Sequence, residues 1–523
     1  MACVAGNVCA ADLAVVSVSP NRHILTAPVA SSIVVEFDKA VNPASITPTT
    51  FWAFGRWSGA VTGSYTFTNA NQTVTLRPDF PFSAGESVMV ILSHDITAAD
   101  ATTLRSSGYS WQFWTKAKHA PMNFAQVASM TTRTNQAQTT QSYGGIGTDL
   151  NHDRYLDLTI VNEDTADLRV FMNKADNTGE YEPFDIPTYP VGATASPSEP
   201  SDFNRDGHTD ICVANIGAQS VSILLGNGDG TYGPAQNIAV GANPRGIAVL
   251  DVDGDGDIDV VNTNFSANNM SILFNNGAGV FGAPTFFEGG SNGERALAAA
   301  DMDDDGLLDL VIGFQSGQFI RVNHSNGDGT FTALAGQSAG GLVWMLNASD
   351  VDGDGDEDVI VVNGLSNNGG ILKNNGDGTL TAPTITATDP FSLASDVGDL
   401  DGDGDLDWIT SSFSGDWQIR TNNGTGTFTF LMEINAPSAA SCSIPLDFDN
   451  DGDLDLALID EIADLLILMQ NSGYTAPIPT IGAWGAIIMA LSVVTAGTLI
   501  MRCETGAMRC GTGIPAGRTC GAS

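Results

Sequence analysis

The sequence predicts an all-β protein, a seven-bladed β-propeller preceded by a smaller all-β domain, with one transmembrane helix near its C-terminus. A nine-residue pattern, Asp-x-Asp/Asn-x-Asp-x-x-x-Asp, occurs seven times in the 523 residues, beginning at Asp149, Asp202, Asp251, Asp301, Asp350, Asp399 and Asp447. Successive copies start 48 to 53 residues apart, and a fixed period of this length indicates a propeller or another repeat array. β-rich segments and turn residues alternate between the copies, whereas residues 481–501 carry no charge.

Each repeat unit contains four predicted strands, which is the number in a propeller blade. An apolar strand such as 296–300 enters the acidic pattern, and a β-rich strand such as 358–362 leaves it. A third strand, such as 222–225, leads into an Asn-Gly-rich turn such as 227–231, because Gly and Asn tolerate the positive φ of tight hairpins. The final strand carries an aromatic residue or Leu, at Tyr232, Phe281, Phe331, Leu380 and Phe428.

The last unit is incomplete. After its acidic pattern it supplies only the strands 456–459 and 465–469 before Pro-rich sequence begins. Residues 122–130, which precede the first pattern, resemble the outer strand that this unit lacks. We therefore predict that they pair with the last blade and close the ring over residues 121–474, since an open array would need caps instead.

The regularly spaced acidic side chains predict metal sites. Oxygen ligands at positions 1, 3, 5 and 9, a main-chain carbonyl at position 7 and a Gly at position 6 suit Ca²⁺ in a tight loop, whereas Mg²⁺ demands stricter geometry. The expected ligands, loop by loop, are Asp149, Asn151, Asp153 and Asp157; Asp202, Asn204, Asp206, His208 and Asp210; Asp251, Asp253, Asp255, Asp257 and Asp259; Asp301, Asp303, Asp305, Leu307 and Asp309; Asp350, Asp352, Asp354, Asp356 and Asp358; Asp399, Asp401, Asp403, Asp405 and Asp407; and Asp447, Asp449, Asp451, Asp453 and Asp455. We expect about six or seven calcium ions.

The first copy departs most from the pattern. Asn151 stands at position 3, and Arg154 replaces the Gly at position 6. Arg at this position brings a positive charge close to the ion and must accept a strained backbone. We expect weak or absent calcium there. The alternative for every copy is that the Asp residues form surface turns without metal.

Residues 121–474 resemble the FG-GAP/VCBS repeat family. The copy Asp251-Val-Asp-Gly-Asp-Gly-Asp-Ile-Asp259 carries the resemblance in full. Integrin relatives of this family form seven-bladed propellers with calcium in Asp-x-Asp-x-Asp-Gly-x-x-Asp loops. The resemblance therefore implies the same fold and the same cofactor.

The sequence predicts a separate all-β domain at residues 12–117. Residues 1–11 precede it; we expect them to be unstructured, and they lack the basic stretch of a signal peptide. The sequence Ile33-Val-Val-Glu-Phe-Asp-Lys-Ala-Val-Asn-Pro43, with later matches at 74–78 and 82–90, resembles the bacterial Ig-like domain of surface-layer and other secreted proteins. The resemblance implies a β-sandwich. We expect this domain to be a spacer; a carbohydrate-binding module is the alternative.

The C-terminal segment predicts a membrane anchor. The uncharged run of residues 481–501 is long enough to cross a bilayer, which takes about 20 residues. Arg502, Arg509 and Arg518 follow it, which places a basic cytoplasmic tail at 503–523 and the propeller outside the cell. Ile478-Pro-Thr-Ile-Gly-Ala-Trp-Gly485 with this run resembles the IPTL-type sorting signal of Gram-negative bacteria, spanning 478–502. The resemblance implies an exosortase-like processing protease, although Ile481, Gly482 and Ala483 replace its usual Leu-Ser-Glu. A buried apolar helix is the alternative.

The composition narrows the function. A formal charge of −40 with only 20 Lys and Arg argues against binding to nucleic acid, whose phosphates require cationic side chains. No catalytic constellation stands out, so we expect no enzyme but a calcium-stabilised extracellular binding or adhesion protein with a protein or polysaccharide ligand. The alternative is a secreted polysaccharide-active enzyme with its site at the axial mouth of the propeller. Trp344, Trp408 and Trp417 could stack on sugars there, although core packing is the commoner role of such residues.

Overall fold

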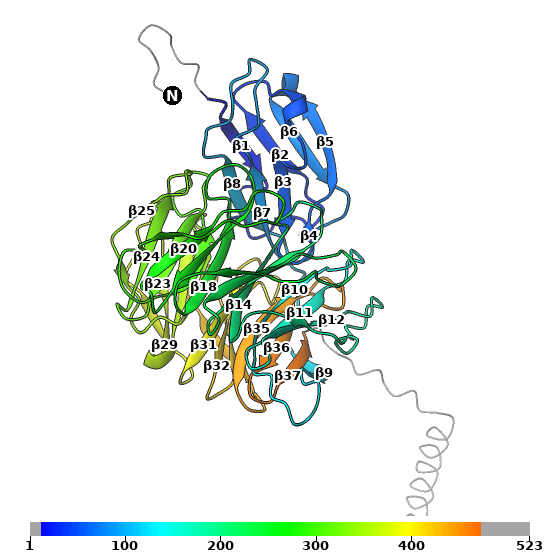
Figure 1. The fold of residues 1–523 in the computed structure, drawn as a ribbon, viewed down its shortest axis with the longest axis vertical. Coiled ribbons are helices and arrows are strands. Elements are labelled where there is room, and N and C mark those ends of the chain that lie inside the picture. Colours follow the sequence, from blue (N-terminus) through cyan, green and yellow to red (C-terminus); the bar gives the residue numbers. More distant parts are fainter. Residues whose placement is uncertain (1–11, 472–523) are drawn as a thin grey trace, which may run out of the picture. The chain divides into compact units, whose positions relative to one another are not determined.

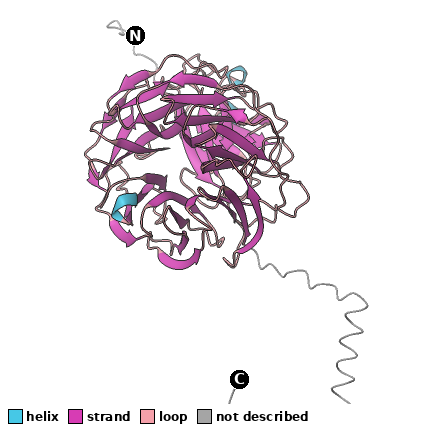
Figure 2. Ribbon diagram, turned by 60° about the horizontal axis from the view of Figure 1, so that its bottom comes forward, coloured by secondary structure: helices cyan, strands magenta, loops and turns pink. Residues whose placement is uncertain are grey.

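The computed structural model describes residues 12–471, and strands make up nearly all of their regular structure (Figures 1 and 2). Three short 3-10 helices interrupt them in this range, at Pro43–Ser45, Asn69–Asn71 and Gly364–Ser366. The predicted N-terminal segment 1–11, the sorting signal and helix at 478–502 and the basic tail at 503–523 lie outside the described residues. Between residues 12 and 471, no helix has the length and apolar character needed to cross a membrane.

The N-terminal domain is a sandwich of two four-stranded antiparallel sheets. One sheet has the order β1-β2-β6-β5, with β1 (Val15–Ser19), β2 (Ile33–Phe37), β6 (Thr73–Pro78) and β5 (Gly63–Thr68). The other has the order β4-β3-β7-β8, with β4 (Gly59–Ala60), β3 (Phe51–Gly55), β7 (Ser87–Leu92) and β8 (Tyr109–Trp114). Alternate residues of β2 are buried against Trp111 and Phe113 of β8, so the two inner faces form one core. The predicted all-β sandwich is confirmed.

Seven further sheets form the repeat region, and six of them are four-stranded. Blade 1 contains β10 (Ser142–Thr148), β11 (Asp157–Asn162), β12 (Asp167–Phe171) and β13 (Tyr189–Pro190); blade 2 contains β14 (Ala195–Ser201), β15 (Asp210–Asn215), β16 (Ser220–Leu224) and β17 (Gln236–Ala239); blade 3 contains β18 (Pro244–Leu250), β19 (Asp259–Asn264), β20 (Asn269–Leu273) and β21 (Thr285–Phe287). Blade 4 contains β22 (Glu294–Ala300), β23 (Asp309–Phe314), β24 (Phe319–Ser325), β25 (Phe331–Ala333) and β26 (Gln337–Ser338); blade 5 contains β27 (Met345–Ser349), β28 (Asp358–Asn363), β29 (Asn368–Leu372) and β30 (Thr384–Ala387). Blade 6 contains β31 (Ser392–Gly398), β32 (Asp407–Ser412), β33 (Trp417–Thr421) and β34 (Thr429–Ile434); blade 7 contains β35 (Ala440–Leu446), β36 (Asp455–Asp460), β37 (Leu465–Gln470) and β9 (Ala125–Thr131).

The blades form a closed ring. The first strand of each blade contacts the first strands of the two neighbouring blades, and β35 contacts β10 to complete the circle. In blade 7 the outer strand is β9, which pairs antiparallel with β37 from Leu465↔Thr131 to Gln470↔Ala125. The predicted pairing of residues 122–130 with the last blade is confirmed. Because the last blade contains strands from both ends of the repeat region, the ring is held shut by sheet hydrogen bonds.

The second strand of each blade is buried on both faces. All six residues of β28, for example, are buried, and they read Asp-Val-Ile-Val-Val-Asn without polar alternation. Such strands are covered by neighbouring blades on both sides, which explains the continuous apolar run. Each acidic pattern lies between the first and second strand of its blade. Since the first strands all run in the same direction, the seven acidic loops are gathered on one face of the ring.

Candidate metal centres

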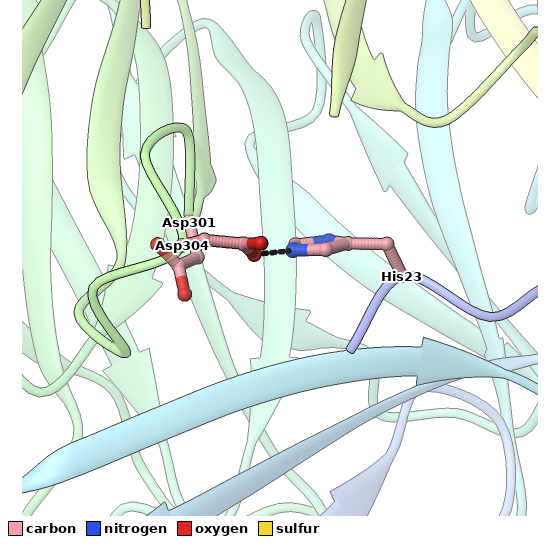
Figure 3. A group of neighbouring side chains, drawn as sticks. All are labelled: His23, Asp301 and Asp304. Atoms are coloured by element: carbon pink, nitrogen blue, oxygen red, sulfur yellow. Dashed lines mark hydrogen bonds and ion pairs between the residues drawn. The ribbon is translucent and has the colours of Figure 1, made fainter. Parts of the chain in front are cut away.

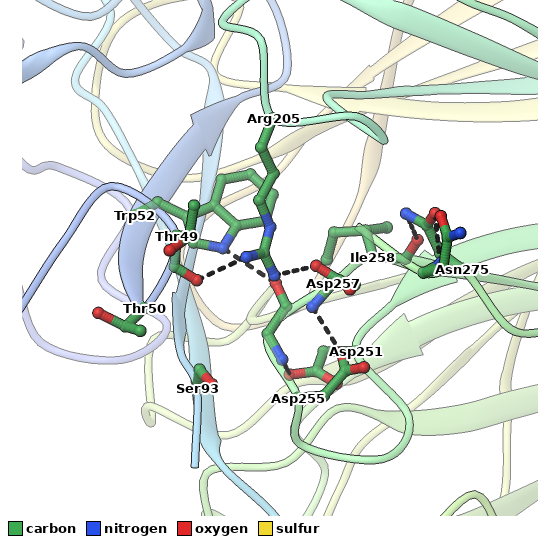
Figure 4. A network of polar contacts seen from close by, with 12 residues as sticks. Thr49, Thr50, Trp52, Ser93, Arg205, Asp251, Asp255, Asp257, Ile258 and Asn275 are labelled. Atoms are coloured by element: carbon green, nitrogen blue, oxygen red, sulfur yellow. Dashed lines mark hydrogen bonds and ion pairs between the residues drawn. The ribbon is translucent and has the colours of Figure 1, made fainter. Parts of the chain in front are cut away.

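The third acidic loop (loop 3) shows how the pattern folds. Asp251 follows β18, and Asp259 is the first residue of β19. The amides of Gly254 and Gly256 donate to the two carboxylate oxygens of Asp251, each at 2.8 Å, so the loop curls around this side chain (Figure 4). Carboxylate oxygens of Asp251, Asp253 and Asp255 lie within 4.8 Å of one another. This is a concave cluster of oxygens of the kind that binds a hard cation.

Position 6 requires a backbone that most side chains avoid. The six glycines at this position have φ between 81° and 103°, and Arg154 in loop 1 has φ 71°. The expected strain at Arg154 is therefore present, because non-glycine residues reach this region at a cost. Asn151 donates to Asp153 Oδ2 at 2.9 Å, and Asn204 makes the same contact with Asp206 Oδ2 in loop 2 at 2.8 Å.

The carboxylate at position 9 is the most deeply buried of each set. All seven of these Asp side chains are at most 1% exposed. In loop 5, Asp358 accepts the amide of Val351 at 3.3 Å and that of Asn374 at 2.8 Å. In the ion-free protein, burial is the main cause that raises the pKa of Asp358 to about 8, and nearby carboxylates add to it. A carboxylate that ionises at this depth would be stabilised by a neighbouring cation.

Several buried carboxylate oxygens have no hydrogen-bond partner among residues 12–471. They are Asp253 Oδ1, Asp352 Oδ1, Asp399 Oδ1, Asp453 Oδ1 and Asp455 Oδ2. Leaving such an atom buried and unpaired costs free energy, whereas coordination to an ion would satisfy it. In loops 3 and 5 the converging donors are carboxylate oxygens, which Ca²⁺ prefers, whereas at loop 4 His23 and His324 also lie beside Asp oxygens. The residues present therefore fit this ion.

Three of the expected ligands contact cationic or histidine side chains of the protein. The Asp257 side chain at position 7 of loop 3 forms an ion pair with Arg205 (Figure 4), and Lys373 Nζ lies 2.6 Å from Asp352 Oδ2 in loop 5. His208, also at position 7, lies 2.7 Å from His152 of loop 1, ring nitrogen to ring nitrogen. At this position only the main-chain carbonyl was expected to bind, and these side chains instead link neighbouring loops.

A repeated Asn connects each of five loops to the next blade, and sequence reasoning missed it. Its amide nitrogen donates to the main-chain oxygen at position 2 of a neighbouring loop, at 2.7–2.8 Å. The five pairs are Asn173 with Phe448, Asn275 with Phe203, Asn374 with Met302, Asn422 with Val351 and Asn471 with Leu400. The available signal was an Asn recurring 15 or 16 residues after position 9.

The Ig-like sandwich contacts the propeller directly. It packs on the face that carries the acidic loops. Trp52 Nε1 donates to Gly256 O at 3.1 Å and the amide of His94 to Gly254 O at 2.8 Å, both in loop 3 (Figure 4 shows Trp52). The amide of Ser110 donates to Gly306 O of loop 4 at 2.8 Å. Main-chain carbonyls of the tight loops point outward, and they provide acceptors for the sandwich.

Four other loops also form hydrogen bonds with the sandwich or with the segment that leaves it. The Asp149 amide of loop 1 donates to Trp57 O at 2.8 Å, and Arg205 of loop 2 donates to Thr49 O at 2.7 Å. The segment that leaves the sandwich donates from the Ala120 amide to Asp401 O of loop 6 at 3.0 Å and from the Lys118 amide to Gly452 O of loop 7 at 2.8 Å.

His23 links loops 4 and 5. Its Nε2 lies 3.1 Å from Asp304 Oδ1 (Figure 3), and its Nδ1 lies 2.8 Å from Glu357 Oε1. Burial lowers the pKa of His23, but the hydrogen bonds to both carboxylates and the charges of Glu357 and Asp301 outweigh burial and raise it to about 10. His23 is therefore a cation at neutral pH. It neutralises carboxylates between the two loops.

Two family profiles match the chain. A profile described as FG-GAP-like repeat matches residues 202–262, 251–312, 350–410 and 399–458, and one described as bacterial Ig-like domain matches residues 10–115. The chain contains an N-terminal bacterial Ig-like domain followed by FG-GAP-like repeats. These repeats include loops 2 to 7, whereas loop 1 with Arg154 lies outside the matched residues. The two module types together suggest a surface or binding protein.

Solved structures with similar folds include BBS1N in complex with ARL6DN, with a TM-score of 0.48, 11% identity, and coverage of 67% of this chain and 98% of that one. Another is an Agrocybe aegerita protein studied for recognition of non-reducing terminal N-acetylglucosamine (TM-score 0.42, 18% identity, 76% and 94% coverage). A third is virginiamycin B lyase from Staphylococcus aureus (TM-score 0.44, 13% identity, 66% and 99% coverage). No curated protein sequence matches the chain.

Proposed function

We propose that this chain is a calcium-stabilised extracellular binding or adhesion protein, tethered at the envelope of a Gram-negative-type bacterium. The observation that carries the proposal is the sevenfold set of buried, converging carboxylates, several of them with unpartnered oxygens. Ions bound between the first two strands of each blade would neutralise these charges and add their binding free energy to folding. We propose six or seven ions, with loop 1 the weakest site.

Binding is favoured over catalysis by the state of the carboxylates that line the centre of the ring. Glu199 pairs with Arg56, Asp396 accepts two hydrogen bonds from Ser443, and Glu357 pairs with His23. Each of them already bonds to a partner, whereas glycoside cleavage needs two carboxyl groups free to face the substrate. The ligand we propose is an extracellular protein or polysaccharide. The large negative charge disfavours nucleic acid.

The proposed tether rests on the sequence of residues 478–523. The uncharged 21-residue run with Arg residues behind it supports insertion into the inner membrane, with the propeller outside the cytoplasm. Its IPTL-like start supports processing by an exosortase-like protease.

Metal content provides the test of the calcium proposal. Purified protein, dialysed against trace calcium, should retain about six ions per chain by elemental analysis. Replacing Asp350 and Asp358 by Asn in loop 5 should lower that number by one, whereas the same change at Asp149 and Asp157 of loop 1 should leave it unchanged. Folded protein without stoichiometric alkaline-earth metal would overturn the proposal.

A screen of the purified protein against polysaccharides and surface proteins separates binding from catalysis. Retention on a ligand without product formation supports the binding protein. Release of product that survives repurification, and that is lost on mutation of Glu199, would show the polysaccharide-active enzyme instead.

A further inference from the structure

A cavity of ≈ 330 Å³ lies at the centre of the ring, lined by residues of the first strands of all seven blades. This volume falls within the range of small-molecule binding sites, about 300–1,000 Å³. Arg56, Trp57 and Trp114 of the Ig-like domain also line it. Because the first strands end in the acidic loops, and the Ig-like domain packs on those loops, these three residues lie at one end of the cavity.

The charged groups at the end near the Ig-like domain are paired. Arg56 Nη1 lies 2.5 Å from Glu199 Oε2. Asp396 Oδ2 accepts the amide and the hydroxyl of Ser443 at 3.2 and 2.8 Å.

The opposite end contains two arginines that form no ion pair within residues 12–471. Arg245 and Arg295 lie near the starts of β18 and β22, so they are at the end away from the acidic loops. Arg295 is 5% exposed, and across residues 12–471 its guanidinium forms no hydrogen bond or ion pair; its Nε is buried without a partner. Arg245 Nε donates to Asn243 Oδ1 at 2.8 Å, a neutral acceptor. A buried cation without an anion is costly, so this end is suited to a ligand that supplies one.

Aromatic rings adjoin the arginines. The guanidinium carbon of Arg295 lies 3.4 Å from the centroid of a Trp344 ring, which holds the charged group in place. Phe391 packs against Trp344 with ring centroids 5.0 Å apart and against Phe413 at 5.8 Å, and Phe413 is 37% exposed. A partly exposed aromatic surface therefore borders the mouth of the cavity.

Two carboxylates lie on this face of the ring in blades 1 and 7, although neither is among the residues that line the cavity. Glu163 follows β11 and Glu461 follows β36, both at the strand ends away from the acidic loops. Glu461 Oε1 accepts a hydrogen bond from Gln141 Nε2 at 2.7 Å, while its Oε2 is buried without a partner. Burial raises the pKa of Tyr143, while the charge of Arg295 lowers it and the charges of Glu461 and Glu163 raise it.

We propose that this open mouth binds a uronate, the carboxylate-bearing sugar unit of acidic polysaccharides. The inference rests on the proposed binding function and names the chemistry of its ligand. The sugar carboxylate pairs with Arg295 and Arg245 through the fork of guanidinium donors. Sugar hydroxyls donate to the acceptor oxygens of Glu461 and Glu163. The apolar face of the pyranose packs on Phe391 and Phe413.

The combination of groups selects this ligand class over other anions. Two cations and two carboxylates on one face of the ring disfavour a polyanion with charges on every side, such as a phosphorylated chain. A neutral sugar would leave Arg295 without its anion, and an acidic peptide would supply carboxylates but no ring of hydroxyl donors for the two Glu residues. A uronate supplies one carboxylate, several hydroxyls and an apolar face.

Calorimetric titration of the full-length protein in calcium-containing buffer tests the inference. The titrants are trigalacturonate and trimannuronate, with cellotriose as the neutral sugar and triglutamate as the acidic peptide. We expect the uronate trimers to bind more tightly than both comparators. Arg295→Met should weaken uronate binding about tenfold to a hundredfold, and Arg295→Lys by less.

Arg321→Met is the matched control. Arg321 also has a buried, unpartnered Nε and lies over the rings of Phe314 and Phe319, but it does not line the cavity. It should leave uronate affinity unchanged. Melting temperature and calcium content, measured on every variant, show whether an effect comes from folding.

Three results would overturn the inference: no uronate binding by calcium-loaded protein, equal affinity for cellotriose or triglutamate, or unchanged affinity in folded Arg295→Met. If the protein retains calcium and binds another surface ligand, the proposed function stands and this inference fails. If calcium is absent, the proposed function fails first.

Discussion

Removing divalent ions should invert the pH dependence of stability. In the ion-free protein, burial raises the pKa of Asp358 and of Asp407 to about 8. An Asp in the unfolded chain has a pKa of about 4. The folded state therefore binds more protons than the unfolded state between these two values. The stabilisation that comes from protonating these buried carboxyl groups is fully present below about pH 4 and is lost as the pH rises through about 8.

The size of the effect follows from these values. Each pH unit between the two pKa values changes the free energy of unfolding by about 1.4 kcal/mol per group. From about pH 5 to about pH 7, one buried position-9 Asp should thus destabilise the ion-free protein by up to about 3 kcal/mol. Bound calcium would instead favour the ionised carboxylate, because protonation competes with coordination. Stability should then decrease toward acid instead.

The assay is urea unfolding followed by circular dichroism, at several pH values, with metal-depleted and calcium-saturated protein. Asp358→Asn should remove one titrating group. In the metal-depleted protein, the free energy of unfolding should then change less steeply with pH. Asp328→Asn, at an exposed hairpin turn, is the control and should leave the slope unchanged. If the metal-depleted protein becomes more stable from about pH 5 to about pH 7, the reasoning is refuted, because the buried carboxylates would then be neutralised by protein groups alone.

Three other substitutions test separate contacts. Asn374→Ala leaves a main-chain carbonyl of the neighbouring loop unpaired. Urea unfolding should therefore show that the free energy of unfolding falls by about 1–3 kcal/mol. Asn375→Ala changes the exposed neighbouring residue, and it should lower the free energy of unfolding by less than about 0.5 kcal/mol. Glu86→Gln places an amide group where four donors converge on a carboxylate, and the domain should lose about 2 kcal/mol in the same assay. His23→Gln removes the cation bonded to Glu357, which should cost about 2 kcal/mol near neutral pH.

The pH dependence distinguishes the His23 prediction from a general packing effect. Because the folded pKa of His23 is raised to about 10, its contribution is fully present below the unfolded value of about 6.5 and is lost as the pH rises through about 10. The stability difference from His23→Gln should narrow over that interval, and a constant difference would contradict the ion pairing. Equal losses from Asn374→Ala and Asn375→Ala would contradict the role given to the inter-blade hydrogen bond. An unchanged Glu86→Gln protein would show that the four donors find other acceptors.

The blades and the acidic loops could be predicted because their determinants are local. Seven Asp-rich patterns in register fix where a strand ends, where the chain turns with positive φ at position 6, and where the next strand begins. The closing strand was also predictable, because the last unit lacked one strand and residues 122–130 supplied it. Trp408 and Trp417 proved to be fully buried core residues, as the commoner role of such rings suggested, while Trp344 lines the cavity.

The docking of the Ig-like domain and the chemistry of the central cavity were settled only in three dimensions. Several of the contacts that hold the domain go to main-chain carbonyls of Gly254, Gly256 and Gly306, and main-chain acceptors are the same in every sequence. Arg295 and Glu461 belong to blades far apart in the sequence, and ring closure alone brings both to the same face of the ring. The sequence by itself thus determined the repeating unit, since short-range backbone geometry and local charge specify it. Only the tertiary structure decided which surfaces meet, because such contacts depend on the closed ring and are not marked by any repeat in the sequence.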